Sequence, residues 1–150
     1  MSKGVTIIPQ PDNVTLQYVS GILSIKQALA RVTGSTLLVS ANTSRNSIGQ
    51  TPVKLKEILI NKISGTFNVQ FDMTSDDHSH NYARIYKNGV GYGTTRQLDG
   101  AQTQTFNEDL AFVEGDLAQI YVWGASTDTN VVVSNFRLYA KSFEPTVNTD

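Results

Sequence analysis

The segment Phe67-Asn68-Val69-Gln70-Phe71-Asp72-Met73 alternates apolar and polar side chains without a break. Successive side chains of a β-strand point to opposite faces, so this pattern predicts a strand with one face in a core and the other in solvent. The turn residues Ser64-Gly65 precede it. We therefore treat this strand as the centre of the fold.

Similar short strands, separated by turn residues, surround this segment. In residues 53–60 the apolar parity switches between Leu55 and Ile58, as a β-bulge in a strand would produce. Asn88-Gly89 is the strongest hairpin signal, because both positions tolerate positive φ. Residues 42–50 are polar and predict a connection. Further strands are expected at residues 35–40, 83–86, 103–106, 110–112, 116–123 and 131–140.

No amphipathic helix of about ten residues separates these strands, which argues against a βαβ fold. We predict an all-β protein, an antiparallel and jelly-roll-like β-sandwich in residues 35–142, followed by a C-terminal tail at 143–150.

Residues 1–34 differ from the sandwich and predict an extended arm followed by a small hairpin. The hairpin pairs residues 14–18 with 22–26 around Ser20-Gly21. Two strands alone are marginally stable in water, so the hairpin is expected to need a second surface. We predict that this region serves attachment or oligomerisation. The candidate attachment residues are Ile7, Ile8, Pro9, Pro11, Leu16 and Tyr18.

The composition excludes several classes of partner. With 150 residues, of which 39% are hydrophobic, the chain can bury one self-sufficient core. A net charge of −1 provides no basic field for nucleic acid or an anionic membrane. Cysteine is absent, which excludes disulfides and thiolate metal sites. No apolar stretch resembles a membrane helix or a signal peptide, so we expect neither membrane insertion nor Sec export. The expected partner is a protein or a glycan.

One group of metal-ligand residue types gathers near the middle of the chain. Its spacing matches neither an EF-hand loop nor a zincin, because His78 and His80 lie only two positions apart. A solvated polar loop is the favoured interpretation, with a bound ion as the alternative, and we predict no cofactor. The residues are Asp72, Asp76, Asp77, His78 and His80.

The sequence lacks the arrangements that catalysis needs. Gly89-Val90-Gly91-Tyr92-Gly93 is not followed by a helix that could hold a phosphate, so we interpret it as a hairpin. There is no Gly-x-Ser-x-Gly, and both histidines sit in one acidic loop. We expect a non-enzymatic protein.

The aromatic residues leave two possibilities open. If Ile120 and Val122 point inward, Tyr121 and Trp123 point outward and need a ligand or a neighbouring subunit; the opposite parity buries them in the core. Flat rings can stack on the apolar faces of sugars. Packing in the core or against a subunit is the favoured interpretation, with ligand stacking as the alternative. The candidates for lining a sugar-binding face are Tyr82, Tyr86, Tyr92, Tyr121 and Trp123, of which Tyr92, Tyr121 and Trp123 are the predicted ligand-binding residues.

Six segments carry a resemblance to a known family: residues 53–58, 64–72, 83–90, 106–109, 114–117 and 133–138. The most telling are Arg84-Ile85-Tyr86-Lys87-Asn88-Gly89-Val90 and the Gly115-Asp116-Leu117 turn. Together they resemble the jelly-roll-like β-sandwich module of tailed-bacteriophage virion surface proteins, of the head decoration, head fibre or tail fibre type. The resemblance covers roughly residues 35–140, and the hairpin at 13–26 is similar to segments that precede such modules in fibre-like proteins.

This resemblance implies a non-enzymatic structural protein, assembled in the host cytoplasm and displayed on the virion surface. It implies other capsid or tail proteins as partners, a homotrimer, and attachment through the N-terminal arm. The alternative is a receptor- or carbohydrate-binding module of a tail fibre or adhesin. Its loops at residues 78–82 and 92–97 would then contact a host-surface glycan.

Overall fold

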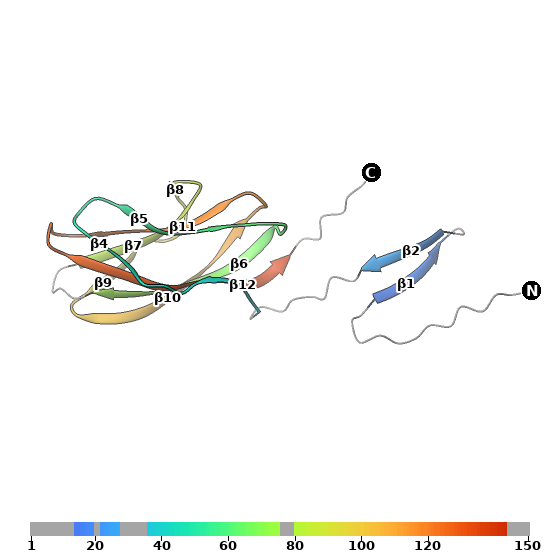
Figure 1. Ribbon diagram of the computed structural model, residues 1–150, viewed down its shortest axis with the longest axis horizontal. Coiled ribbons are helices and arrows are strands. Elements are labelled where there is room, and N and C mark those ends of the chain that lie inside the picture. The colour runs from blue at the N-terminus through green and yellow to red at the C-terminus, as the bar shows by residue number, and fades with distance from the viewer. Residues whose placement is uncertain (1–13, 20–21, 28–35, 76–79, 144–150) are drawn as a thin grey trace, which may run out of the picture. The chain divides into compact units, whose positions relative to one another are not determined.

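A computed structural model of the chain describes residues 14–19, 22–27, 36–75 and 80–143. The regular elements among these residues are β-strands (Figure 1). The chain divides into two compact units, Met1–Arg31 and Val32–Asp150. In the described part of the chain no helix is long and apolar enough to cross a membrane. The predicted arm residues Ile7, Ile8, Pro9 and Pro11 lie outside the described residues.

The first unit contains a hairpin of two antiparallel strands, β1 (Val14–Val19) and β2 (Ile22–Gln27). The ladder runs from Val14 opposite Gln27 to Val19 opposite Ile22, which confirms the predicted pairing of these two segments. Leu16 and Tyr18 lie on β1, opposite Ile25 and Leu23 in the ladder. Their role in attachment stays a prediction.

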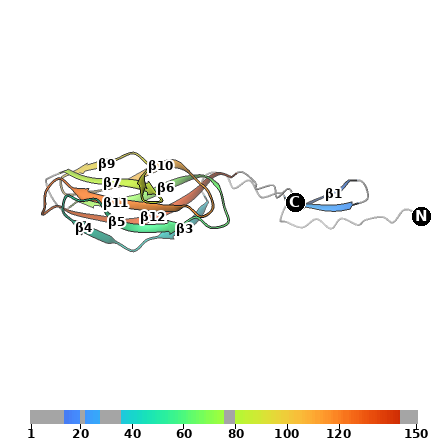
Figure 2. The ribbon, with the colours of Figure 1, turned by 90° about the horizontal axis from the view of Figure 1, so that it is seen from above.

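The second unit is a sandwich of two antiparallel sheets, as the sequence predicted. The β6 sheet contains, in spatial order, β10 (Gln102–Phe112), β6 (Gly65–Ser75), β12 (Asn130–Phe143) and β3 (Leu37–Ala41), with β4 (Arg45–Ile48) also paired to β12. The β11 sheet contains β5 (Val53–Leu59), β11 (Leu117–Gly124), β7 (His80–Lys87) and β8 (Val90–Gly91), with β9 (Arg96–Asp99) also paired to β7. Figure 2 shows β9 and β10 along one side of the sandwich and β3 and β4 along the other.

The core lies between the two sheets. Phe67, Val69, Phe71 and Met73 of β6 are each at most 2% exposed, which confirms the alternation predicted for this strand. They belong to one cluster of buried apolar side chains that both sheets contribute. Burial of such side chains is the main stabilising contribution to a sandwich of this kind.

Two local features of the sequence fold as predicted. Where β5 pairs with β11, Ile120 lies opposite Lys56 and the next residue, Tyr121, lies opposite Lys54. Leu55 is therefore the extra residue of a bulge. Asn88 and Gly89 have φ angles of 52° and 82° between the paired ends of β7 and β8, which fits the predicted tight hairpin.

The prediction of a plain connection at residues 42–50 was wrong, because β4 lies within it and pairs with β12 from Val133↔Arg45 to Asn130↔Ile48. Most of its side chains are exposed, so the strand needs no apolar alternation. The two strands predicted at 103–106 and 110–112 are one continuous strand, β10.

Candidate functional site

The parity of β11 decides where its aromatic side chains lie. Ile120 and Val122 are 0% exposed and point into the core. Tyr121 and Trp123 alternate with them and are half-buried on the outer face of the β11 sheet. Of the two parities that the sequence left open, the structure has the outward one.

The neighbouring strand β7 follows the same alternation. Ala83 and Ile85 are buried in the core, while Tyr82, Arg84 and Tyr86 are half-buried on the outer face. Since β7 and β11 are hydrogen-bonded neighbours, their outward aromatic side chains lie next to each other.

These four outward rings form two stacked pairs. Trp123 lies directly opposite Tyr82, with the ring centroids 5.5 Å apart and the planes 19° from parallel. Tyr86 and Tyr121 stack at 4.0 Å and 24°. We call Tyr82, Tyr86, Tyr121 and Trp123 the aromatic face.

The polar groups of the aromatic face are open to a ligand. Among the residues that the structure describes, neither the three tyrosine hydroxyls nor the Trp123 indole N–H has a hydrogen-bond partner in the protein. Buried tyrosine and tryptophan side chains usually have such partners. Here these groups are available to solvent or to a bound molecule.

A charged cluster on β5 borders the aromatic face. Lys54 lies opposite Tyr121 in the ladder, and its Nζ is 2.7 Å from Glu57 Oε2. Gln119 Nε2 donates to the same carboxylate at 2.6 Å. The hydrogen bonds from Lys54 and Gln119 lower the pKa of Glu57, and the bond to Glu57 raises the pKa of Lys54. The positive charge of Lys54 is thus balanced by an adjacent carboxylate.

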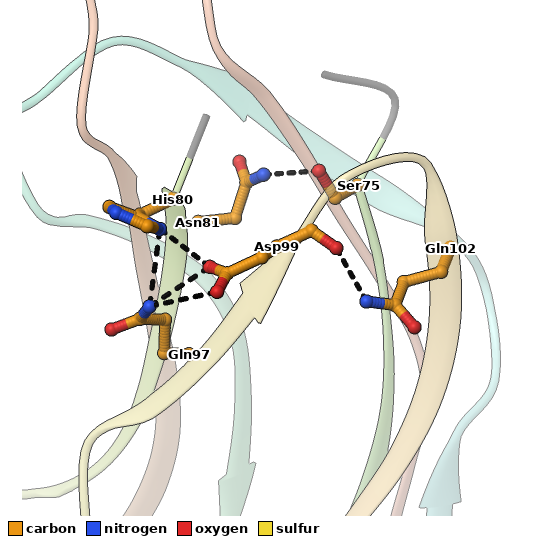
Figure 3. A network of polar contacts seen from close by, with 6 residues as sticks. All are labelled: Ser75, His80, Asn81, Gln97, Asp99 and Gln102. Atoms are coloured by element: carbon orange, nitrogen blue, oxygen red, sulfur yellow. Dashed lines mark hydrogen bonds and ion pairs between the residues drawn. The ribbon is translucent and has the colours of Figure 1, made fainter. Parts of the chain in front are cut away.

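A second polar cluster lies at the other border, where β7 pairs with β9 (Figure 3). His80 Nδ1 is 2.6 Å from Asp99 Oδ1, and Gln97 Nε2 donates to the same carboxylate at 2.9 Å. These contacts lower the pKa of Asp99. The His80 ring is 6.5 Å from that of Tyr82.

The structure groups Tyr121 and Trp123, but it places Tyr92 elsewhere. Tyr92 is 41% exposed and its ring meets Phe112 edge-on at 5.7 Å. Its hydroxyl donates to the carbonyl of Ala111 at 3.0 Å, and Lys87 Nζ lies 5.3 Å from its ring centroid. Tyr92 therefore packs toward β10. Ligand binding by Tyr92, Tyr121 and Trp123 stays a prediction.

The group proposed as a possible ion site is divided between the two sheets. Asp72 lies on β6 and accepts hydrogen bonds from Thr105 Oγ1 at 2.7 Å and Asn135 Nδ2 at 2.6 Å. His80 lies on β7 of the other sheet, and residues 76–79 are outside the described part. The described residues contain no group of three or more His, Asp or Glu side chains that could hold a metal ion.

The outer face of the β6 sheet has a different character. Its polar side chains are bonded to one another across the strands, so fewer of their groups are left for a ligand. The pairs are Asn68 with Asp109 at 2.7 Å, Thr74 with Thr103 at 2.8 Å, Asp72 with Thr105 at 2.7 Å and Tyr139 with Gln70 at 3.3 Å.

No family model and no curated protein matches the sequence. Solved structures with a similar fold include a family 35 carbohydrate-binding module from an environmental isolate, which is 14% identical with a TM-score of 0.48 over 77% of this chain and 94% of that chain. A CBM35 structure from Paenibacillus barcinonensis is 19% identical with a TM-score of 0.44 over 74% and 96%. The structure of infectious bursal disease virus Gx strain is 11% identical with a TM-score of 0.46 over 85% and 36%. These similarities are too distant to assign a function.

Proposed function

We propose that the protein is a non-enzymatic binding module that holds a carbohydrate against the aromatic face of the β11 sheet. The observation that carries this proposal is the pair of ring stacks, Tyr82 with Trp123 and Tyr86 with Tyr121, on an outward face. Sugar rings combine apolar C–H faces with hydroxyl groups. An aromatic side chain with an unused polar group can satisfy both.

The layout of the rings favours an extended ligand. Tyr82 and Tyr86 are four residues apart on β7, which corresponds to about 13 Å along a strand. In each stacked pair one face of each ring is already covered by its partner, so a ligand meets the remaining faces and the ring edges. An oligosaccharide lying along β7 and β11 contacts both pairs, whereas a monosaccharide contacts one.

A purely structural role for the four rings is the competing explanation. Aromatic pairs across neighbouring strands contribute roughly 0.2–1 kcal/mol to sheet stability without any ligand. The two explanations differ in their consequences. Removing one ring lowers only stability in the structural case, and also lowers affinity for a glycan in the binding case.

The test is a glycan array with the full-length protein, followed by titration of the bound oligosaccharide. We expect Trp123→Ala and Tyr121→Ala to weaken binding by about tenfold or more. Tyr139→Ala is the matched control, because Tyr139 is a half-buried tyrosine on the outer face of the opposite sheet. Thermal unfolding checks that each variant is folded. Absence of binding to any glycan, or unchanged affinity in both aromatic variants, contradicts the proposal.

A second candidate function is a surface subunit of a tailed-bacteriophage virion, attached through its N-terminal residues and forming a homotrimer. The observation that favours it is the separate unit Met1–Arg31, whose β1–β2 hairpin is too small to be stable alone. A surface of another virion protein, or of neighbouring copies of this chain, would supply the packing contacts that a two-stranded hairpin lacks. Glycan binding is compatible with this role, as in a tail fibre or adhesin.

Immunogold electron microscopy of purified virions, with an antibody against Val32–Asp150, tests the second candidate. Regular labelling of head or tail supports it, and light scattering of the purified full-length chain should give the mass of a trimer. Virions that lack the chain contradict this role.

A further inference from the structure

We infer that the ligand of the aromatic face is an acidic glycan, and that Arg84 binds its anionic group. This inference rests on the proposed carbohydrate-binding function and adds the chemical class of the sugar. Arg84 lies on β7 between Tyr82 and Tyr86, with the same outward parity, and opposite Tyr121 in the ladder. The backbone of Arg84 thus lies between the backbones of two residues of the aromatic face.

The backbone of the following hairpin holds this side chain in place. Arg84 Nε donates to the carbonyl oxygen of Gly93 at 2.7 Å. The guanidinium also lies against Gly91, where a Cβ atom would be only 2.8 Å from both Cζ and Nη1. Glycine at position 91 is therefore what allows the guanidinium to occupy this position.

The two terminal amino groups of Arg84 remain available. Within the described residues they have no hydrogen-bond partner and Arg84 forms no ion pair. At the borders of the face, Lys54 pairs with Glu57, and Asp99 accepts a hydrogen bond from Gln97 and contacts His80. Arg84 is thus a preoriented cation without an ion-pair partner among the described residues, and its guanidinium lies at the β8 border of the aromatic face.

The free amino groups of Arg84 favour an anion that offers two or more oxygens bonded to the same atom, as a carboxylate or a sulfate does. A guanidinium matches carboxylate oxygens in a two-point contact, and its bonds to ionised groups are stronger than bonds between neutral groups. A neutral sugar would cover Arg84 without offering such a partner, which costs free energy. The chemistry shared by the suitable ligands is a pyranose that bears a carboxylate or a sulfate.

The experiment titrates the full-length protein with three probes: a short oligogalacturonate, the corresponding neutral oligogalactoside and a sulfated galactan oligosaccharide. We expect tighter binding of at least one acidic probe than of the neutral one, by about tenfold or more. The uronate and sulfate arms distinguish the two sources of negative charge. Raising the salt concentration should weaken acidic binding and leave neutral binding unchanged.

Three variants assign the effect to Arg84. Arg84→Met keeps most of the apolar stem and removes the charge, so it should abolish the preference for the acidic probe. Gly91→Ala keeps the charge but displaces the guanidinium, and should reduce the same preference. Lys54→Met is the matched control, because it removes one positive charge from the same face where Glu57 already balances it. It should change the preference by less than about twofold. Thermal unfolding verifies that the variants fold.

Each outcome separates the inference from the proposed function. Equal binding of neutral and acidic probes, or an acidic preference that survives Arg84→Met, overturns the inference and leaves carbohydrate binding standing. Binding to none of the three probes or to any arrayed glycan overturns both.

Discussion

Asp116 is a nearly buried carboxylate, with its side chain only 8% exposed at the turn between β10 and β11. Lys87 Nζ lies 2.7 Å from it, and Asn88 Nδ2 and the backbone N–H of Val113 each donate to it at 2.7 Å. Burial acts to raise the pKa of Asp116, but the hydrogen bonds from Lys87, Val113 and Asn88 outweigh it and hold the pKa below 3.8. This one side chain ties the β7–β8 hairpin to the neighbouring turn.

We expect Asp116→Asn to lower the free energy of unfolding by about 1–3 kcal/mol at pH 7. A carboxylate with a depressed folded-state pKa contributes stability above its unfolded pKa, and that contribution is lost as pH falls through the folded value. The difference between wild type and variant should therefore shrink below pH 3.8. Urea unfolding at pH 7 and in acid measures it.

Asp109→Asn is the control for this prediction. Asp109 pairs with Lys141 on the outer face of the β6 sheet, and its side chain is 41% exposed. Exposed ion pairs contribute little, so the effect at pH 7 should be smaller than that of Asp116→Asn. Equal stability of wild type and Asp116→Asn at pH 7 contradicts the role given to Asp116.

At the scale of elements, two charged side chains join the sheets at opposite sides of the sandwich. Lys56 of β5 is 7% exposed, and its Nζ donates to the carbonyls of Ala41, at 2.7 Å, and Thr43. Burial, followed by the nearby charge of Arg45, lowers the pKa of Lys56. Glu108 of β10 accepts hydrogen bonds from the backbone N–H of Thr94, at 2.9 Å, and from its hydroxyl, at 2.7 Å. The hydrogen bonds of Lys56 and of Glu108 each hold a loop of one sheet against a strand of the other.

We expect Glu108→Ala to release the loop between β8 and β9. Hydrogen exchange at the Thr94 amide should accelerate by about tenfold, because the carboxylate is the group that this N–H bonds. Asp109→Ala is the control, since Asp109 is the next residue on β10 and points the other way, toward Asn68 and Lys141. Unchanged exchange at Thr94 in Glu108→Ala, or equal acceleration in both variants, contradicts this role.

These elements also show what could be predicted from sequence. The strand β6 and the β7–β8 hairpin could be predicted from sequence, because apolar alternation determines the first and the Asn88-Gly89 turn determines the second. The strand β4 was missed because most of its side chains are exposed and need no apolar pattern, and β9 was missed because Leu98 is its only buried side chain. The polar run Asn107-Glu108-Asp109 made β10 look like two strands, because Glu108 makes its bonds to a loop of the other sheet.

The candidate site was predictable only in part for a similar reason. Alternation in β11 shows that Tyr121 and Trp123 share a face, but which face depends on packing against the other sheet. Arg84 looks like an ordinary solvated residue in the sequence. Its orientation comes from the carbonyl of Gly93 and the missing side chain of Gly91, which are contacts across the β7–β8 hairpin.

At the scale of the whole molecule, the described core and the aromatic face belong to one unit. The buried apolar residues run from Ile58 to Ala140, and the four aromatic residues lie between Tyr82 and Trp123. Both sets fall inside Val32–Asp150, while the β1–β2 hairpin belongs to Met1–Arg31. All the described residues of the core and of the aromatic face therefore come from the second unit.

We therefore expect the fragment Val32–Asp150 to fold and to bind the same glycan as the full-length chain. Its thermal midpoint should lie within about 4 °C of the full-length value, which corresponds to a difference of about 1 kcal/mol or less. Circular dichroism follows unfolding and titration measures affinity, with the full-length chain as reference. A fragment that loses its cooperative transition shows that the N-terminal unit stabilises the sandwich. A fragment that folds but loses affinity shows that residues 1–31 contribute to the ligand site.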